Sequence, residues 1–123
     1  MNSLNYINEK SELSKEYLDC YNTSILVIDK MYREKTLTEK EKNALEENVM
    51  STLYLIKLKK DLENPKLKEN ERKHIQRKVA EYEKREQESR RVVAKHLKEF
   101  NKRVAEKLQE KENAKKKAKG MGR

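Results

Sequence analysis

Residues that break or cross-link a chain are scarce in this 123-residue sequence, which has two glycines, one proline, one cysteine and no tryptophan. With Cys20 alone, no disulfide can form within the chain, and a reducing cytoplasmic setting is expected. The longest apolar run, residues 25–28, is far shorter than the ~20 residues of a membrane span. The first residues also lack the apolar core of a secretory signal, so we expect no membrane association.

Charged residues are abundant instead, at 43% of the chain against 34% for apolar residues. This composition is typical of long-helix proteins, and so short a chain buries a large core only if a partner supplies part of it. Residues 1–65 contain 10 Lys and Arg against 12 Asp and Glu, whereas residues 66–123 contain 21 against 10. The near-neutral half suits packing against protein, and the basic half suits polyanions or an acidic surface.

Apolar residues recur at helical spacing in two segments of the near-neutral half. The first segment covers about residues 11–34. The second begins at Thr38, which forms a capping-box pattern with Glu41, and it ends at Asn64-Pro65. Its wide apolar face predicts contact with more than one neighbour. Because the connection is so short, residues 11–63 are predicted to form an antiparallel helical hairpin.

A third helical pattern runs unbroken from about residue 70 to 113, which corresponds to roughly 65 Å. Eight of its apolar residues, from Ile75 to Leu108, share one narrow arc, and KREQESRR, residues 84–91, divides that arc into two patches. The predicted fold is all-α: the antiparallel hairpin packs on the start of a long C-terminal coiled-coil-like helix. This long, basic, amphipathic helix is assigned to residues 64–113. A flexible N-terminal arm at 1–10 and a disordered basic tail at 114–123 complete the expected organisation.

The two apolar patches have different predicted roles. The first, Ile75, Val79 and Tyr82, is assigned to the bundle, whereas the second lies beyond the reach of the hairpin and forms a docking strip or a self-pairing seam. A homomeric coiled coil and a helix of another protein are both open as its occupant. The N-terminal arm is predicted to be a second contact element. The predicted partner-binding residues are Val93, Leu97, Phe100, Val104, Leu108, Leu4, Tyr6 and Ile7.

The opposite side of the third helix is basic, and so is the tail. Arg77, Lys84 and Arg91 share this side, although mixed charge on a helix is often only solvated surface. Contact with phosphates through such residues is electrostatic and independent of base sequence. The predicted nucleic-acid-binding residues are Lys95, Lys98, Lys102, Lys115, Lys116, Lys117 and Lys119.

No arrangement of residues suggests catalysis. His74 and His96 are 22 positions apart, about 33 Å along a helix, which is too far to share a metal ion. Cys20 has no predictable basic neighbour that would activate its thiol. The only glycines, at 120 and 122, cannot form a phosphate-binding loop. We therefore predict a non-enzymatic protein without a metal ion or cofactor.

Two resemblances add a biological setting. The stretch LVIDKMYREKTLTEKEKNALEENV, residues 26–49, resembles a helical hairpin common in small proteins of Gram-positive phages and mobile elements, with Lys35 or Thr36 in place of the usual glycine. The overall build is similar to that of a recombination directionality factor for a large serine integrase. This resemblance implies a non-catalytic accessory protein in the bacterial host cell. It would bind the integrase near its coiled-coil arm and redirect it from integration to excision.

Two further functions remain open. One is a homodimeric coiled-coil scaffold or assembly protein. The other is a DNA-binding transcriptional regulator of the helix-turn-helix kind. Glu39, Glu41, Glu46 and Glu47 argue against the regulator, because they make the second helix acidic where a recognition helix would enter a DNA groove.

Overall fold

The computed structural model describes residues 14–121, with the backbone alone described for residues 115–121. This part of the chain is all-α, as predicted. Its elements in chain order are α2 (Lys15–Arg33), α3 (Glu39–Leu62), α4 (Glu69–Val93), the short 3₁₀-helix η1 (Ala94–His96) and α5 (Leu97–Met121). None of these helices combines the length and the apolar character that crossing a membrane would require.

The connection between α2 and α3 is fixed at both ends by hydrogen bonds, between backbone groups at the end of α2 and from backbone to side chains at the start of α3. Lys35 adopts a left-handed φ of 61°, and the N–H groups of Lys35 and Thr36 donate to the carbonyls of Tyr32 and Met31 at 3.0 Å each. This pair of bonds is the Schellman motif that ends many helices. At the start of α3 the predicted capping box is confirmed, since Thr38 and Glu41 each bond the other's backbone N–H, at 3.1 and 2.9 Å.

Lys35 occupies a position that glycine fills at lower cost, because a Cβ atom crowds the left-handed conformation. We expect Lys35→Gly to raise the free energy of unfolding by about 1 kcal/mol. Urea unfolding followed by circular dichroism measures the change. Lys84→Gly is the matched control: it replaces an exposed lysine in the middle of α4 and should lower stability by about 1 kcal/mol. Equal losses in both variants would contradict the left-handed assignment.

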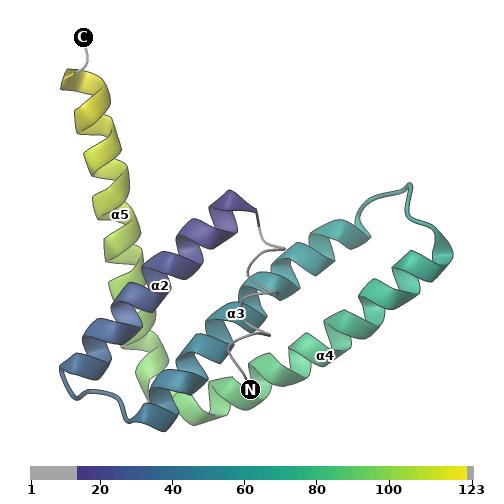
Figure 1. Cartoon of the computed structure of the whole chain (residues 1–123), viewed down its shortest axis with the longest axis horizontal. Helices are drawn as coiled ribbons and strands as arrows, with labels where there is room; N and C mark the ends of the chain where they lie inside the picture. Colours follow the sequence, from purple (N-terminus) through teal and green to yellow (C-terminus); the bar gives the residue numbers. More distant parts are fainter. Residues whose placement is uncertain (1–13, 122–123) are drawn as a thin grey trace.

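Helix α3 lies at the centre of the bundle, with α2 on one side and α4 on the other (Figure 1). Its wide apolar face contacts both neighbours, and the contact with α4 is the more extensive. The rings of Tyr54 and Tyr82 lie 4.5 Å apart between α3 and α4. The buried apolar side chains of α3 are Leu45, Val49, Met50, Leu53, Tyr54, Leu55 and Leu58.

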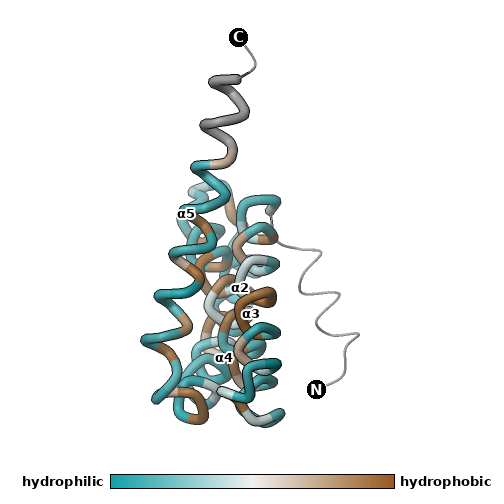
Figure 2. Tube along the Cα trace, turned by 90° about the vertical axis from the view of Figure 1, so that its left-hand side faces the viewer, coloured by the Kyte–Doolittle hydropathy of each residue, from teal (hydrophilic) through white to brown (hydrophobic). Residues whose placement is uncertain are grey.

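The prediction of one long third helix is wrong, because the chain turns sharply after Val93. Val93 leaves helical geometry at φ −112° and ψ 13°, and η1 separates α4 from α5. Helix α5 then runs back across α2 as a separate layer (Figures 1 and 2). It continues to Met121, past residue 113 where the sequence pattern suggested a helix end and a disordered tail.

The polar stretch KREQESRR lies against α3 and makes a polar contact there. Asn48 of α3 donates from Nδ2 to the Glu86 carbonyl and to Ser89 Oγ, each at 3.2 Å. Arg85 donates to the two carboxylate oxygens of Glu47 at 2.5 and 3.2 Å. Asn48, Glu86 and Ser89 are all buried. The stretch therefore lacks apolar residues because its inner side bonds α3, and it does not simply separate two apolar patches.

Candidate functional site

The predicted docking strip is not a free surface. Val93 is 0% exposed and Phe100 is 4% exposed, and both belong to the core that α2 and α3 share. Leu97 and Val104 are half-buried against the same core. The interpretation of this strip as an exposed surface is therefore wrong, and the reason is the turn at η1, which returns α5 to its own bundle.

The remaining predicted partner-binding residues are Leu108, Leu4, Tyr6 and Ile7, and the structure describes only Leu108 among them. Leu108 is half-buried on α5, where the helix still follows α2. Leu4, Tyr6 and Ile7 lie outside the described residues. No continuous apolar docking surface is formed by the predicted residues that the structure describes.

Polar side chains hold α5 against α2 beyond the apolar contact. Arg103 Nη1 lies 2.6 Å from Glu34 Oε1, and Lys111 Nζ donates to Thr23 Oγ1 at 2.8 Å. The hydrogen bond from Arg103 holds the pKa of Glu34 below its usual value. The two contacts pair residues in opposite chain order, 34 with 103 and 23 with 111, along the line where α5 crosses α2 (Figure 1).

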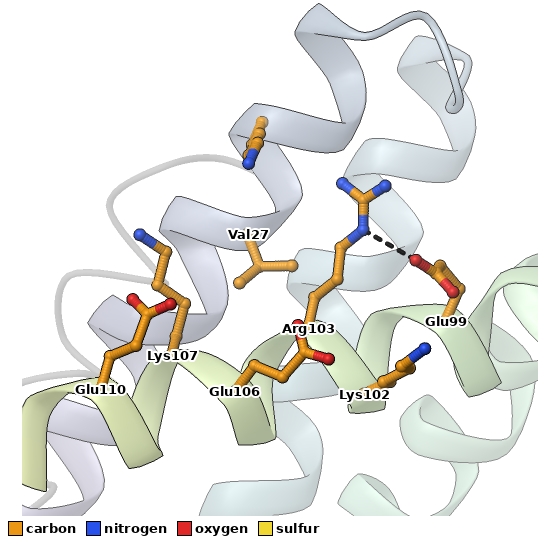
Figure 3. Close-up of a pocket in the computed structure, with 8 residues that line it drawn as sticks. Val27, Glu99, Lys102, Arg103, Glu106, Lys107 and Glu110 are labelled. Atoms are coloured by element: carbon orange, nitrogen blue, oxygen red, sulfur yellow. Dashed lines mark hydrogen bonds and ion pairs between the residues drawn. The ribbon is translucent and has the colours of Figure 1, made fainter. Parts of the chain in front are cut away.

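A shallow cavity lies between these two helices (Figure 3). Val27 projects from α2 toward α5, and Arg103 reaches the Glu99 carboxylate at 3.0 Å. The side chains that line the cavity are Val27, Lys30, Glu99, Lys102, Arg103, Glu106, Lys107 and Glu110. Because acidic and basic groups alternate around it, the cavity is not specialised for a ligand of either charge.

The turn between α4 and α5 is anchored to the first turn of α3. His96 Nε2 lies 2.6 Å from Glu41 Oε2, and Lys95 Nζ lies 3.7 Å from the same oxygen. The pKa of Glu41 is lowered to about 2, first by the backbone N–H of Thr38 and then by the His96 hydrogen bond. Glu41 therefore caps α3 and fixes the turn with one carboxylate. The sequence pattern revealed the cap but gave no signal for the second role.

Basic residues of the third predicted helix remain on the surface, as expected from their position opposite the apolar arc. Lys95, Lys98 and Lys102 are exposed, and so are Arg77, Lys84 and Arg91 on α4. Lys95 is partly neutralised by Glu41, whereas Lys98 and Lys102 form no ion pair with any residue from 14 to 114. The turn at η1 divides the predicted single stripe between two helices.

For the lysines of the predicted tail, the structure describes the backbone and not the side chains. Lys115, Lys116, Lys117 and Lys119 belong to the last turns of α5, and their side chains lie outside the described residues. Their backbone nevertheless continues the helix that carries Lys98 and Lys102 past the end of the other helices (Figure 1).

Comparison with models of protein families, with curated proteins and with solved structures found no match to this chain. Its function must therefore be inferred from its own residues.

The titratable residues considered for chemistry do not come together. His74 is exposed on α4, whereas His96 bonds Glu41 at the turn. Cys20 is half-buried on α2. Across residues 14–114, no three His, Cys, Asp or Glu side chains are placed to hold a metal ion. The outer sides of α4 and α5 expose basic side chains, among them Arg77, Lys84, Lys98 and Lys102.

Proposed function

We propose that this protein is a non-enzymatic accessory protein of a phage or mobile element, which assists a DNA-acting protein of the recombinase type. In this proposal it contacts DNA electrostatically, through the outer side of α5. The observation that carries the proposal is the exposure of Lys98 and Lys102 without an acidic partner in the described part of the chain. Their positive charge is available to phosphates.

The charge distribution supports contact with the DNA backbone. The chain carries a formal net charge of +9, and the excess lies entirely after residue 65. Such a surface attracts phosphates by releasing their counterions and does not distinguish bases. Binding is therefore expected to weaken steeply with salt and to depend little on DNA sequence.

The link to recombination rests on the resemblance that the sequence suggests to a recombination directionality factor. Of the build behind that resemblance, the basic C-terminal part remains, whereas the single long helix and the free apolar strip do not. The route of contact differs from the sequence-based prediction, because the apolar strip is occupied by the chain itself. A recombinase would instead meet the exposed polar and basic side chains of α4 and α5. Surfaces of this kind set the rate and orientation of encounter more than the final affinity.

The experiment that tests the DNA contact compares two double variants with equal loss of charge. Lys98→Gln with Lys102→Gln should weaken binding to a labelled duplex in fluorescence anisotropy. The slope of log affinity against log salt should fall by about 2 in magnitude, close to one unit for each phosphate contact. The control is Lys40→Gln with Lys59→Gln, two exposed lysines of α3.

Equal losses in the two variants would assign binding to net charge alone and remove α5 as the interface. The recombination part is tested separately, with a purified large serine integrase from the same host element. Addition of the protein should raise the yield of excision over integration on attachment-site DNA. An unchanged ratio would contradict the directionality role, whatever the result with DNA alone.

A further inference from the structure

The turn between α4 and α5 is built from residues that favour a continuous helix. The chain contains no glycine or proline between Pro65 and Gly120, and the turn itself is Ala94, Lys95 and His96. Alanine and lysine are among the best helix formers. Sharp breaks in helices usually coincide with proline, glycine or an inserted group. The local sequence therefore does not explain the turn.

Contacts with other parts of the molecule hold the turn in place. Val93 and Phe100, on either side of η1, are buried in the common core. His96 bonds Glu41 at the start of α3, and Arg103 bonds Glu34 at the end of α2. Each of these contacts joins α5 or the turn to α2 or α3. If α5 leaves α2, nothing in the turn opposes its conversion into regular helix.

A straightened α4–α5 helix would have one apolar side. At 100° per residue, eight apolar residues share an arc of roughly 80°, as in a coiled-coil seam: Ile75, Val79, Tyr82, Val93, Leu97, Phe100, Val104 and Leu108. Opening would expose Phe100 and Val104 on α5 and would uncover Val27 on α2. These two newly exposed surfaces are complementary, because they are the two sides of one existing contact. The partner that presents both of them is a second copy of this chain.

We propose that two copies of the chain associate by exchanging α5, so that α5 of each protomer packs on α2 of the other. This arrangement is a domain swap, which forms a dimer from contacts that the monomer already makes. The 34–103 ion pair and the 23–111 hydrogen bond are remade between protomers. The turn at Ala94–His96 becomes helical in each protomer. The proposal is independent of DNA binding and of the proposed function.

The balance between the two forms depends on protein concentration. Within one chain the short turn keeps α5 at a high effective concentration near α2, which favours the monomer in dilute solution. The population of the dimer rises with protein concentration. Exchange is slow because α5 must first detach from α2. Refolding at high protein concentration is therefore the most direct route to the swapped form.

Light scattering after refolding over a range of concentrations measures the oligomeric state. We expect a monomer of 14.8 kDa and, at the highest concentrations, a species of twice that mass that persists on rapid dilution. A chain that remains monomeric after refolding at every concentration would overturn the proposal.

Charge reversal separates exchange of α5 from other kinds of dimer. Glu34→Arg and Arg103→Glu each place like charges in the intramolecular pair. When the two variants are refolded together, a swapped heterodimer restores both pairs, whereas either homodimer restores none. At low salt we expect heterodimers in several-fold excess over homodimers. Random pairing would give as much heterodimer as the two homodimers combined.

A matched control uses a pair that exchange cannot restore. Glu69 and Lys73 are neighbours within α4, with the Lys73 Nζ lying 3.7 Å from Glu69 Oε1. A mixture of Glu69→Arg and Lys73→Glu should give heterodimers and homodimers at the random ratio. The same excess in both mixtures would mean that opposite net charge alone drives pairing, and random ratios in both would mean a dimer without exchange. Either result would reject the swap.

Discussion

Phe100→Ala is expected to lower the free energy of unfolding by about 3–5 kcal/mol, the usual cost of removing a buried phenylalanine ring. The side chain is 4% exposed and fills the junction where α5 returns to the bundle. Deleting it leaves a cavity between helices that are separated widely in the sequence. For a domain whose total stability is about 5–15 kcal/mol, this is a large share. Urea unfolding, followed by circular dichroism, measures the loss.

Val92→Ala is the control for this prediction. Val92 lies beside the same turn but is 38% exposed, so its truncation should change stability by less than about 1 kcal/mol. Similar small effects at both positions would mean that Phe100 is not buried in solution. Such a result would also return the strip around Phe100 to the surface as a candidate docking site.

Asn48→Ala is expected to cost about 1–3 kcal/mol, because the substitution breaks a buried polar contact between α3 and α4. The Asn48 amide serves both the Glu86 carbonyl and the Ser89 hydroxyl oxygen, at 3.2 Å each. Without it, these two oxygens lose a donor in a region shielded from water. Thermal or urea unfolding reports the change.

The effect of losing an asparagine side chain elsewhere on the same helix provides the comparison. Asn43 is exposed on α3, so Asn43→Ala should leave stability unchanged or slightly raised through the better helix propensity of alanine. If Asn48→Ala proved equally neutral, the contact between KREQESRR and α3 would have no energetic weight.

The local features of the fold could be predicted from the sequence because their causes lie within a few residues. The all-α class followed from composition and from apolar spacing. The capping box of Thr38 and Glu41 followed from a spacing of three residues, and both of its bonds are present. The end of α3 at Leu62 agrees with the position of Pro65. In each case the cause is a backbone N–H group, which either bonds a side chain nearby in the sequence, as in the capping box, or is missing, as in Pro65.

The turn after Val93 could not be predicted in the same way, because its causes are distant. Ala94, Lys95 and His96 resemble helix interior, and Glu41, which fixes the turn, lies 55 positions before His96. Without the turn, the pattern of apolar residues implied a free strip. The same difficulty affected residues 84–91, whose polar inner side is explained only by Asn48 and Glu47 on another helix.

For the same physical reason, the exposed lysines of the candidate site could be predicted from the sequence, whereas the burial of Phe100 could not. Exposure of Lys95, Lys98 and Lys102 depends on their side of a helix, which apolar periodicity fixes well. Burial of Phe100 depends on which helix returns to cover it, and periodicity carries no information on that choice. A narrow apolar side indicates that something covers it, but it does not distinguish the same chain from a partner.

The shared role of Glu41 has a consequence for the order in which the molecule folds. The hydrogen bond to His96 closes a loop of 55 residues, whereas the capping bonds close only three. Loops of such different length form on different timescales, and long ones raise the contact order that slows folding. The first turn of α3 can therefore be in place before α5 arrives. Glu41, already held by the capping bonds, would then accept the hydrogen bond of His96 as α5 docks. This bond would favour the turn at Ala94–His96 over a continuous α4–α5 helix.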